Sequence, residues 1–440
     1  MKTWHESEKE LPVWGHFDVL VCGGGPAGIG AALRAGRMGV KTMILDRNDC
    51  LGGIATAGMM SHWTGRSSSR LLKEIKTRTK KAGEVAFFAD EGAGGEWAVG
   101  DHVIATDAMK IVLDEMMAEA GVEILYYTTV CDVCLRDGKI CGVIVENKSG
   151  RGVIGADYVV DATGDGDVAA FAGVPYCLGR ESDHKMQPAT IMFKIGGVDD
   201  SRAVYPGSFE TLVPTEKGEL QALGKETLPF PAGHVLLYQQ PLPGTVCVNM
   251  TNAIDVDGTD AASVTRATIE CRAQILPIIR FLRRYAPGYE NCYLIGAASL
   301  LGVRETRHFS GKNSLQENDI LTARYHEDWV VRHAYFNFDV HNLSGAGLDA
   351  TGIQHKWQQS GTYTIPYGCL LPEGIEGLLL SGRNIAGSHL AHSNFRVMPV
   401  CIAIGEAAGT AAALAKMHGN ISLGGVTAAE IQQIVGEDDA

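Results

Sequence analysis

Three glycines near the N-terminus have the spacing that dinucleotide-binding loops use. Gly23, Gly25 and Gly28 form the pattern G-x-G-x-x-G. In this pattern the first glycine permits a tight turn, the second lets a pyrophosphate approach the backbone, and the third lets a helix pack closely on a strand. The pattern therefore predicts that a dinucleotide binds at a helix N-terminus, beside Pro26 and Ala27, where unpaired N–H groups favour negative charge.

The elements on either side of these glycines have the required order. The apolar run 18–22 predicts a buried strand, and residues 26–38 predict a helix that ends at Gly39. A second short strand ends at Asp46, which lies 21 residues after Gly25. Because a carboxylate about 20 residues beyond the glycines accepts hydrogen bonds from a ribose in such units, we expect Asp46 to bind the ribose.

The whole chain is expected to form an α/β domain that is interrupted by a mainly β insertion. Residues 186–290 contain more Pro, Thr and aromatic residues than their flanks, with strand-like stretches and a helix near 264–284. The C-terminal part returns to the first style, with a short strand at 378–380 and a helix over 400–417. We therefore predict a Rossmann-like domain with a parallel sheet plus a mainly β (α+β) inserted substrate domain. Residues 1–185 and 291–440 are predicted to form the first domain, and residues 186–290 the inserted substrate domain, or cap. In an alternative division, residues 325–365 also contribute to this cap.

The composition argues against several classes of partner. Of 440 residues, 38 are Lys or Arg and 51 are Asp or Glu, a formal net charge of −13. This charge argues against binding to nucleic acid, tRNA included, and to an anionic membrane surface. The charged N-terminal segment has no secretory apolar core, and we identify no apolar run near the length of about 18 residues that a spanning helix needs. The 11 scattered cysteines do not form a disulfide framework. We expect a cytoplasmic protein with a small-molecule substrate, and the oligomeric state stays open, a homo-oligomer included.

Later segments give a resemblance to a known family. They are Gly52–Gly58, Asp161–Asp167, Ser381–Asn384, Arg396–Pro399 and Gly405–Ala412. In this order after the glycine loop, they resemble the bacterial FAD-dependent oxidoreductase family of the glutathione-reductase-like (two-dinucleotide-binding-type) flavoprotein superfamily. The resemblance covers both ends of the chain and implies that the cofactor is FAD.

The resemblance also implies which residues hold FAD. Gly52 and Gly53 would pass close to the pyrophosphate and ribityl chain, and Gly164 would lie beside the first glycine loop. The N-terminus of the last long helix, near Met398, would stabilise negative charge on the flavin through the helix dipole. The predicted FAD-binding residues are Gly23, Gly25, Pro26, Ala27, Gly28, Asp46, Arg47, Gly52, Gly53, Ala55, Thr56, Val130, Thr163, Gly164, Asp165, Gly382, Arg383, Arg396, Val397 and Met398.

This sequence departs from the pattern of its relatives at several positions, and these differences exclude some classes of flavoprotein. Many relatives carry Gly-Asp before the last helix, whereas this chain has Gly382-Arg383, so another group is expected to contact the ribityl chain. The C-x4-C pair of disulfide reductases is replaced by the single Cys50, which argues against a flavin–disulfide relay. A second G-x-G-x-x-G after a strand is also missing, so a dedicated NAD(P)H domain is not expected. Cys131 and Cys134 lie three apart on a predicted strand and face opposite ways, which argues against a redox or metal pair.

Five polar side chains are candidates for the chemistry beside the flavin. Arg304 and Arg307 are expected to clamp a carboxylate or to set the local electrostatics, and the alternative is an ion pair on a structural turn. His389 and His392 precede the last long helix, where a histidine is suited to remove an alcohol or amine proton. Their alternative role is a hydrogen bond to the cofactor or to the loop. His62 follows the glycine pair and is expected to reach the flavin as a catalytic or attachment residue; otherwise it is a loop histidine.

The expected reaction is two-electron hydride transfer between a small polar metabolite (an alcohol, amine or hydroxy acid) and flavin N5. Asp339 and His341 suggest a metal, but a third ligand of suitable spacing is lacking nearby, so no metal site is predicted. One alternative is reduction of an activated C=C bond, with an arginine as proton donor or carboxylate clamp. Another is an electron-transfer subunit of a larger complex, against which the missing cysteine-cluster motifs count.

Overall fold

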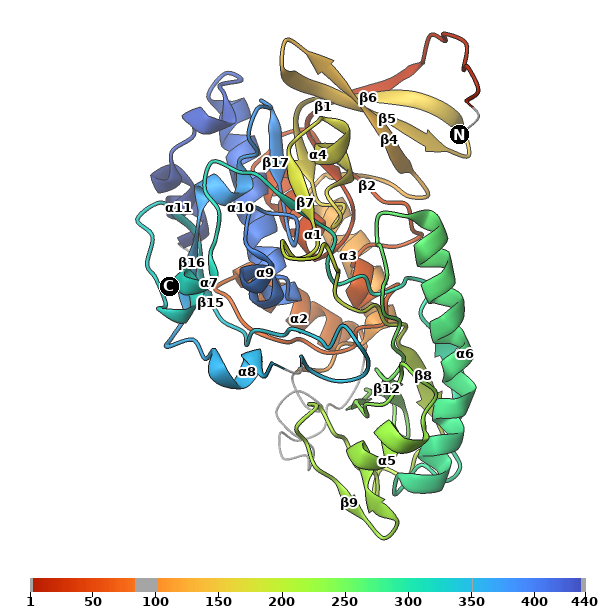
Figure 1. Ribbon diagram of the computed structural model, residues 1–440. Coiled ribbons are helices and arrows are strands. Elements are labelled where there is room, and N and C mark those ends of the chain that lie inside the picture. Colours follow the sequence, from red (N-terminus) through yellow and green to blue (C-terminus); the bar gives the residue numbers. More distant parts are fainter. Residues whose placement is uncertain (1–2, 84–101, 350, 437–440) are drawn as a thin grey trace.

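The computed structural model describes residues 3–83, 102–349 and 351–436, and its largest sheet carries the glycine loop (Figure 1). The strands of this sheet are β1 (Val13–Cys22), β2 (Thr42–Leu45), β3 (Glu123–Leu125), β4 (Thr129–Arg136), β5 (Lys139–Asn147), β6 (Gly150–Asp161) and β17 (Leu378–Leu380). They lie in the order β3-β2-β1-β6-β5-β4, and β17 also pairs with β6. The pairs from β3 through β1 to β6 and β17 are parallel, whereas β4 and β5 form an antiparallel extension of β6. The predicted α/β class is therefore confirmed, with a mixed sheet that is parallel at the glycine loop.

Three strands of this sheet end at the same edge. Cys22 of β1 is in register with Asp161 of β6, and Asp161 is in register with Leu380 of β17. The loops that follow these strands therefore meet at the carboxyl edge of the sheet, where ligands of open α/β sheets bind. Sequence segments near residues 23, 163 and 382 come together in this way.

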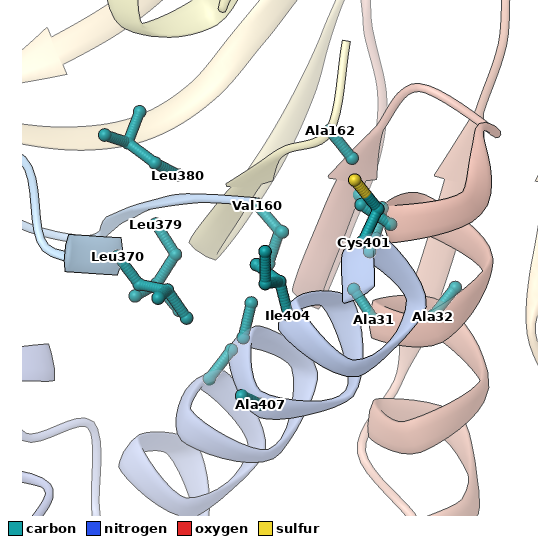
Figure 2. Packing of buried hydrophobic residues seen from close by; sticks show 14 of the residues in the cluster. Ala31, Ala32, Val160, Ala162, Leu370, Leu379, Leu380, Cys401, Ile404 and Ala407 are labelled. Atoms are coloured by element: carbon teal, nitrogen blue, oxygen red, sulfur yellow. The ribbon is translucent and has the colours of Figure 1, made fainter. Parts of the chain in front are cut away.

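Two helices from opposite ends of the chain pack directly on each other and on the sheet. These are α1 (Pro26–Arg37) and α10 (Met398–Met417). Figure 2 shows Ala31 of α1 beside Ile404 of α10, with Val160 of β6 packed against the same cluster. Glycines permit the contact, because a Cβ on Gly409 would lie 2.2 Å from the carbonyl oxygen of Ala31.

Helix α10 has the length and hydropathy of a membrane span, although its apolar window is entirely buried inside the protein. The expectation that the chain contains no apolar run near that length was therefore wrong. The physical reason for the run is the position of α10, which is enclosed on its sides by α1, β6 and β15 (Trp329–Ala334). Such a helix is apolar all round because it is a core helix.

A second sheet has its own apolar core. It consists of β8 (Phe193–Gly196), β11 (Leu237–Gln239), β12 (Val246–Val248) and β13 (Tyr293–Ala297) in the antiparallel order β11-β12-β8-β13. The long helix α6 (Ala261–Tyr285) runs beside it (Figure 1), and residues such as Ile278 and Leu282 pack into the same core. Strand β13 lies beyond the expected boundary at 290, so this sheet draws on both sides of that boundary. The domain division stays a prediction.

Shorter elements connect and cover these sheets. They are α2 (Arg70–Ala82), α3 (Thr106–Glu119), α4 (Asp167–Phe171), β7 (Tyr176–Leu178), β9 (Pro214–Thr215), β10 (Gly218–Glu219), α5 (Leu220–Thr227), β14 (Arg307–Phe309), α7 (Glu317–Leu321), α8 (Ile353–Lys356), β16 (Tyr363–Pro366), α9 (His389–Phe395) and α11 (Ala428–Gly436), with short 3-10 turns at Gly53–Ala55, Tyr367–Leu370 and Leu423–Gly425. Strand β14 pairs with β7, and β15 pairs with β16. Strand β16 contacts α9, because Tyr363 Oη donates a hydrogen bond to Asn394 Oδ1 at 2.8 Å.

The α1–α10 contact predicts the effect of one methyl group. Gly409→Ala raises intrinsic helix propensity by about 1 kcal/mol, yet its Cβ would overlap the backbone of α1. We expect a net loss of about 1–3 kcal/mol, seen as a lower midpoint of urea unfolding. Gly361→Ala is the control, because its Cβ would meet only Ala323 at 3.5 Å, an ordinary contact. Equal stability of both variants would contradict the close packing.

Candidate functional site

A cavity of about 1110 Å3 lies between the carboxyl edge of the central sheet and the second sheet. One wall is the glycine loop with the backbone of Gly25 and Gly53, and the opposite wall carries Tyr238 and Asn249. The lining contains more positive than negative side chains, although the protein as a whole is acidic. These charged lining residues are Arg47, Arg66, Lys76, Arg304, Arg383 and Arg396, together with Asp46, Asp165, Glu210 and Asp339. The cavity is thus suited to an anionic ligand.

The end of the cavity at the glycine loop fits an extended dinucleotide. Gly25 is the N-cap of α1, and a Cβ added there would meet no atom within 4 Å. A Cβ on Gly53 would lie 2.9 Å from the Cα of Gly25, so two bare backbones face each other at this point. The N-terminus of α1 has no side-chain cap, which leaves its N–H groups available to a pyrophosphate.

Asp46 is fixed where a ribose would bind. Its Oδ2 accepts a hydrogen bond from the Gly24 N–H at 2.5 Å, and its Oδ1 accepts two from Asn48 at 2.7 Å. These bonds hold the carboxylate at the end of β2 while the residue still lines the cavity. Arg47 and Asn48 line the cavity beside it.

The loops after β6 and β17 are tied together by a buried ion pair. Arg383 Nη2 lies 2.5 Å from Asp165 Oδ1, and Thr306 donates a hydrogen bond to the same carboxylate oxygen at 2.9 Å. Gly164 takes a left-handed φ of 84°, which lets the chain turn beneath the Arg383 guanidinium. Many relatives carry an aspartate directly after the glycine at position 382. In this chain Asp165, on the neighbouring loop, places a carboxylate beside Arg383 instead.

The N-terminus of α10 opens into the cavity. Val397, Met398 and Cys401 line it, and the N-cap Val397 provides no side-chain cap. Uncapped N–H groups and the dipole of a 20-residue helix favour negative charge at this point. The donor set therefore fits a flavin ring that gains negative charge when reduced.

A cluster of charged and aromatic side chains occupies the other end of the cavity. Arg396 Nη2 lies 2.8 Å from Asp339 Oδ2, and His341 Nε2 lies 3.3 Å from the same oxygen. Arg304 Nη1 donates to Pro188 O at 2.5 Å and to Thr190 Oγ1 at 2.9 Å. Two guanidinium groups thus stand against one carboxylate, which leaves a net positive charge for a ligand to neutralise.

The titratable groups of this cluster are strongly perturbed. Burial, reinforced by Arg396, lowers the pKa of Arg304 to about 10, so its guanidinium stays charged at neutral pH. Burial and the Arg304 charge lower the pKa of His341 to about 4. Burial opposes ionisation of Asp339, but His341 and the two arginines outweigh it and hold the pKa of that carboxyl below its usual value.

His62 is a neutral, enclosed imidazole in the lining of the cavity. Burial, with a smaller effect of His102, lowers its pKa to about 3. Its ring stacks on Tyr238 with centroids 3.7 Å apart, and its Nδ1 has no hydrogen-bond partner among the described residues. The imidazole is therefore neutral at neutral pH.

Most of the sequence-predicted site residues line this one cavity. The lining includes Arg304 and His62 of the predicted catalytic residues. It also includes the predicted cofactor-binding residues Gly23, Gly25, Pro26, Ala27, Asp46, Arg47, Gly53, Thr163, Gly164, Asp165, Gly382, Arg383, Arg396, Val397 and Met398. Segments far apart in sequence therefore do build one site.

Other predicted cofactor residues lie behind the lining. A Cβ on Gly28 would lie 1.8 Å from the carbonyl oxygen of Gly23, so this glycine serves strand–helix packing. Gly52 has a left-handed φ of 98°, and Thr56 Oγ1 donates to Leu51 O at 2.6 Å, so both shape the turn that contains the buried Ala55. Val130 pairs with Val145 in β4 and β5 and does not line the cavity, because its side chain is part of the sheet core.

Three predicted catalytic residues also lie outside the lining. Arg307 Nη1 donates to Asp165 O and to Asp167 Oδ1, both at 2.8 Å, which is the ion pair named as its alternative role. His389 Nδ1 lies 2.5 Å from Glu305 Oε1, and His392 is buried beside His308. The geometry gives these histidines no contact with the cavity, because α9 directs them toward Glu305.

Sequence reasoning missed the residues that the second sheet contributes. Tyr238 and Asn249 line the cavity, and both come from strand-like segments without a motif. Asp339 and His341 were noted in the sequence only as a weak metal signal. Their spacing was the one available hint that a polar cluster forms there.

The mixed sheet, the glycine loop and the uncapped helix N-termini fit a dinucleotide-binding protein. The model of the FAD dependent oxidoreductase family matches residues 18–435, and the chain belongs to this family. Its cofactor is FAD. The narrower expectation of a bacterial, glutathione-reductase-like subgroup stays a prediction, as does the cytoplasmic setting.

Curated relatives share part of the chain. The thiamine thiazole synthase of Methanococcus aeolicus is 31% identical over 163 residues, which are 34% of this chain and 57% of that protein. The thiamine thiazole synthase of Sulfolobus acidocaldarius is 31% identical over 176 residues, 36% of this chain and 61% of that protein. The matched region thus spans less than two thirds of the length of these relatives.

Solved structures share the fold across nearly the whole chain. A geranylgeranyl bacteriochlorophyll reductase-like protein from Thermoplasma acidophilum has a TM-score of 0.52 at 15% identity, covering 96% of this chain and 84% of that chain. A triple mutant of a flavin-dependent brominase has a TM-score of 0.51 at 11% identity, with coverage of 96% and 84%. At these identities the likeness concerns the fold alone.

Because the space beside Gly25 is open, we expect a substitution of this glycine to weaken FAD binding without disturbing the fold. Gly25 has an ordinary φ of −71°, so Gly25→Ala introduces a methyl group into the cavity without backbone strain. We expect the variant to fold while its FAD affinity falls at least about tenfold, since the pyrophosphate then loses its close backbone approach. Flavin content after gel filtration measures this, with Gly361→Ala as the control. Full FAD occupancy of Gly25→Ala would contradict the placement.

Proposed function

We propose that the protein removes a hydride from a small metabolite that carries a carboxylate next to an alcohol or amine carbon, a hydroxy acid or an amino acid. The observation that carries the proposal is the pair of enclosed guanidinium groups, Arg304 and Arg396, opposed by the single carboxylate of Asp339. Burying an uncompensated positive charge is costly, so this cluster is stabilised by an anionic ligand. Arginine is well suited to hold a carboxylate through two parallel hydrogen bonds.

The chain's own residues divide the remaining work. Bound FAD supplies the two-electron acceptor for the hydride. Arg304 holds the substrate carboxylate, and Asp339 keeps Arg396 in place at 2.8 Å. His62 accepts the hydroxyl or amine proton, because its imidazole lines the cavity and is neutral. Tyr238 stacks on the His62 ring and fixes its orientation.

A second candidate function is reduction of an activated C=C bond. The lowered pKa of Arg304, about 10, supports this candidate, because it brings the guanidinium closer to the range of a proton donor. In this direction the substrate is a carboxylate-bearing alkene. Both candidates use the same anion site, and they differ in which substrates oxidise or reduce the flavin.

Anaerobic mixing of the FAD-loaded protein with substrate panels tests the proposal. We expect 2-hydroxy or 2-amino acids to bleach the flavin absorbance, and the matching alcohols or amines without a carboxylate to fail. Arg304→Gln is expected to weaken binding of the effective acid by about 10- to 100-fold through loss of a charge-assisted hydrogen bond. The exposed Arg202→Gln is the matched control.

The other outcomes are distinguishable in the same assay. Reoxidation of photoreduced protein by enoates, without bleaching by acids, would favour the C=C reductase. Failure of every small molecule to react in either direction would favour an electron-transfer subunit. If uncharged alcohols bleached the flavin absorbance equally in the wild-type protein and in Arg304→Gln, Arg304 would not be a binding site for a substrate carboxylate.

The assignment of His62 as the proton acceptor predicts an unusual pH dependence of the rate of flavin reduction. A histidine with its ordinary pKa of about 6.5 loses its proton-accepting form as pH falls below that value. With a pKa lowered to about 3, His62 stays neutral down to pH values of about 5. The rate constant for flavin reduction is therefore expected to stay level between about pH 5 and 8.

Substitution of this histidine provides the matching test. His62→Gln is expected to lower the rate constant for flavin reduction by about 10²- to 10⁴-fold, with flavin content unchanged. His234→Gln is the control, because His234 is equally buried, has a pKa of about 3, and does not line the cavity. A fall in the rate constant below about pH 6.5, or an unchanged rate constant in His62→Gln, would show that another group accepts the substrate proton.

A further inference from the structure

Outside the cavity, two histidines converge on one carboxylate oxygen. His308 Nε2 lies 2.8 Å and His389 Nδ1 lies 2.5 Å from Glu305 Oε1. The ligand atoms of all three side chains lie within 4.8 Å of one another. Glu305 is fully enclosed, and the two histidine side chains are only 10% and 13% exposed. None of the three lines the FAD cavity.

The elements that carry these side chains are firmly placed. Glu305 and His308 lie three residues apart in the segment that enters β14, and His389 is the first residue of α9. The second carboxylate oxygen, Oε2, accepts a hydrogen bond from the Gln187 N–H at 3.1 Å. This bond orients the carboxylate so that Oε1 faces both imidazoles, as the outer contacts of metal ligands do.

A third histidine beside the cluster gives an independent sign of a missing ligand. His392 lies one turn after His389 on α9, and its ring centroid is 4.9 Å from that of His308. It is 1% exposed, yet its Nδ1 has no hydrogen-bond partner in the described part of the chain. Buried polar atoms are almost always satisfied, and an exception indicates a water or ion.

We propose that Glu305, His308 and His389 bind a divalent transition-metal ion. Imidazole nitrogens with one carboxylate suit zinc, iron or manganese, whereas calcium and magnesium prefer oxygen ligands throughout. Bound there, the ion joins β14 to α9. Because α9 leads directly to Arg396 and α10, the ion fixes the segment that enters the cavity. The site does not depend on the proposed reaction.

Zinc uptake by the FAD-loaded protein tests the site. After treatment with a chelator, the protein is equilibrated with Zn2+, desalted and analysed for metal by mass spectrometry. We expect about one zinc ion per chain and a melting temperature raised by a few degrees, since a ligand that binds only the folded state stabilises it. The double variant His308→Asn/His389→Asn is expected to lose both effects.

Two further variants keep the result decisive. Glu305→Gln preserves side-chain shape and is expected to lower zinc occupancy at least about tenfold, even if the double variant folds poorly. His16→Asn is the matched control, because His16 also contacts a carboxylate, Asp157, at 3.0 Å but lies on the surface. Absence of zinc from the wild-type protein would overturn the proposal. So would zinc retained in both the double variant and Glu305→Gln, because it would then belong to other side chains.

Discussion

The contact between α1 and α10 is the constraint on which the rest of the site depends. The two helices approach until a Cβ on Gly405 would lie 2.0 Å from the carbonyl oxygen of Ala27, and only glycine permits this distance. The contact is locked by a buried ion pair, in which Arg34 Nη2 lies 2.7 Å from Glu406 Oε1. Because the helices come from opposite ends of the chain, their packing brings two uncapped helix N-termini to one cavity. Two positive helix ends at one cavity favour a ligand with negative charge at two points, as FAD has at its pyrophosphate and its reduced ring.

The second sheet forms another wall of the cavity that carries the glycine loop. Its residue Tyr238 meets His62 from the first part of the chain, and Arg304 is bonded to Pro188 and Thr190 near β8. The cavity lining is therefore assembled from both parts of the fold. Enclosure has an electrostatic consequence as well, because burial lowers the pKa of His62 to about 3 and of Arg304 to about 10. The imidazole is therefore neutral and the guanidinium charged at neutral pH, whereas a solvent-exposed histidine would become protonated at acidic pH.

How much of this was predictable from sequence follows from how local each signal is. The strand–loop–helix unit around Gly25 and the carboxylate of Asp46 are encoded within about 30 residues, so they could be placed without a structure. The ends of β6 and β17 were placed through a resemblance to relatives. By contrast, the direction of a side chain on α9 depends on which neighbour the helix packs against. His389 and His392 were expected at the flavin because they precede α10. In the structure neither residue lines the cavity, and His389 contacts Glu305 instead. Tyr238 could not be found because a short buried strand carries no chemical signature.

The histidines show how one residue type acquires different tasks within a single fold. At His62 the environment provides burial and an aromatic surface but no carboxylate, so the ring is neutral and its Nδ1 is unpartnered among the described residues. At His341 a carboxylate is present, but burial and the nearby Arg304 charge outweigh it, and the pKa of the imidazole is still lowered to about 4. At His308 and His389 the carboxylate of Glu305 is shared by two rings, an arrangement of one acid and two imidazoles that underlies the proposed metal site. The number of carboxylates and guanidinium groups near each ring therefore gives the three sites different electrostatic environments, although the residue type is the same in all of them.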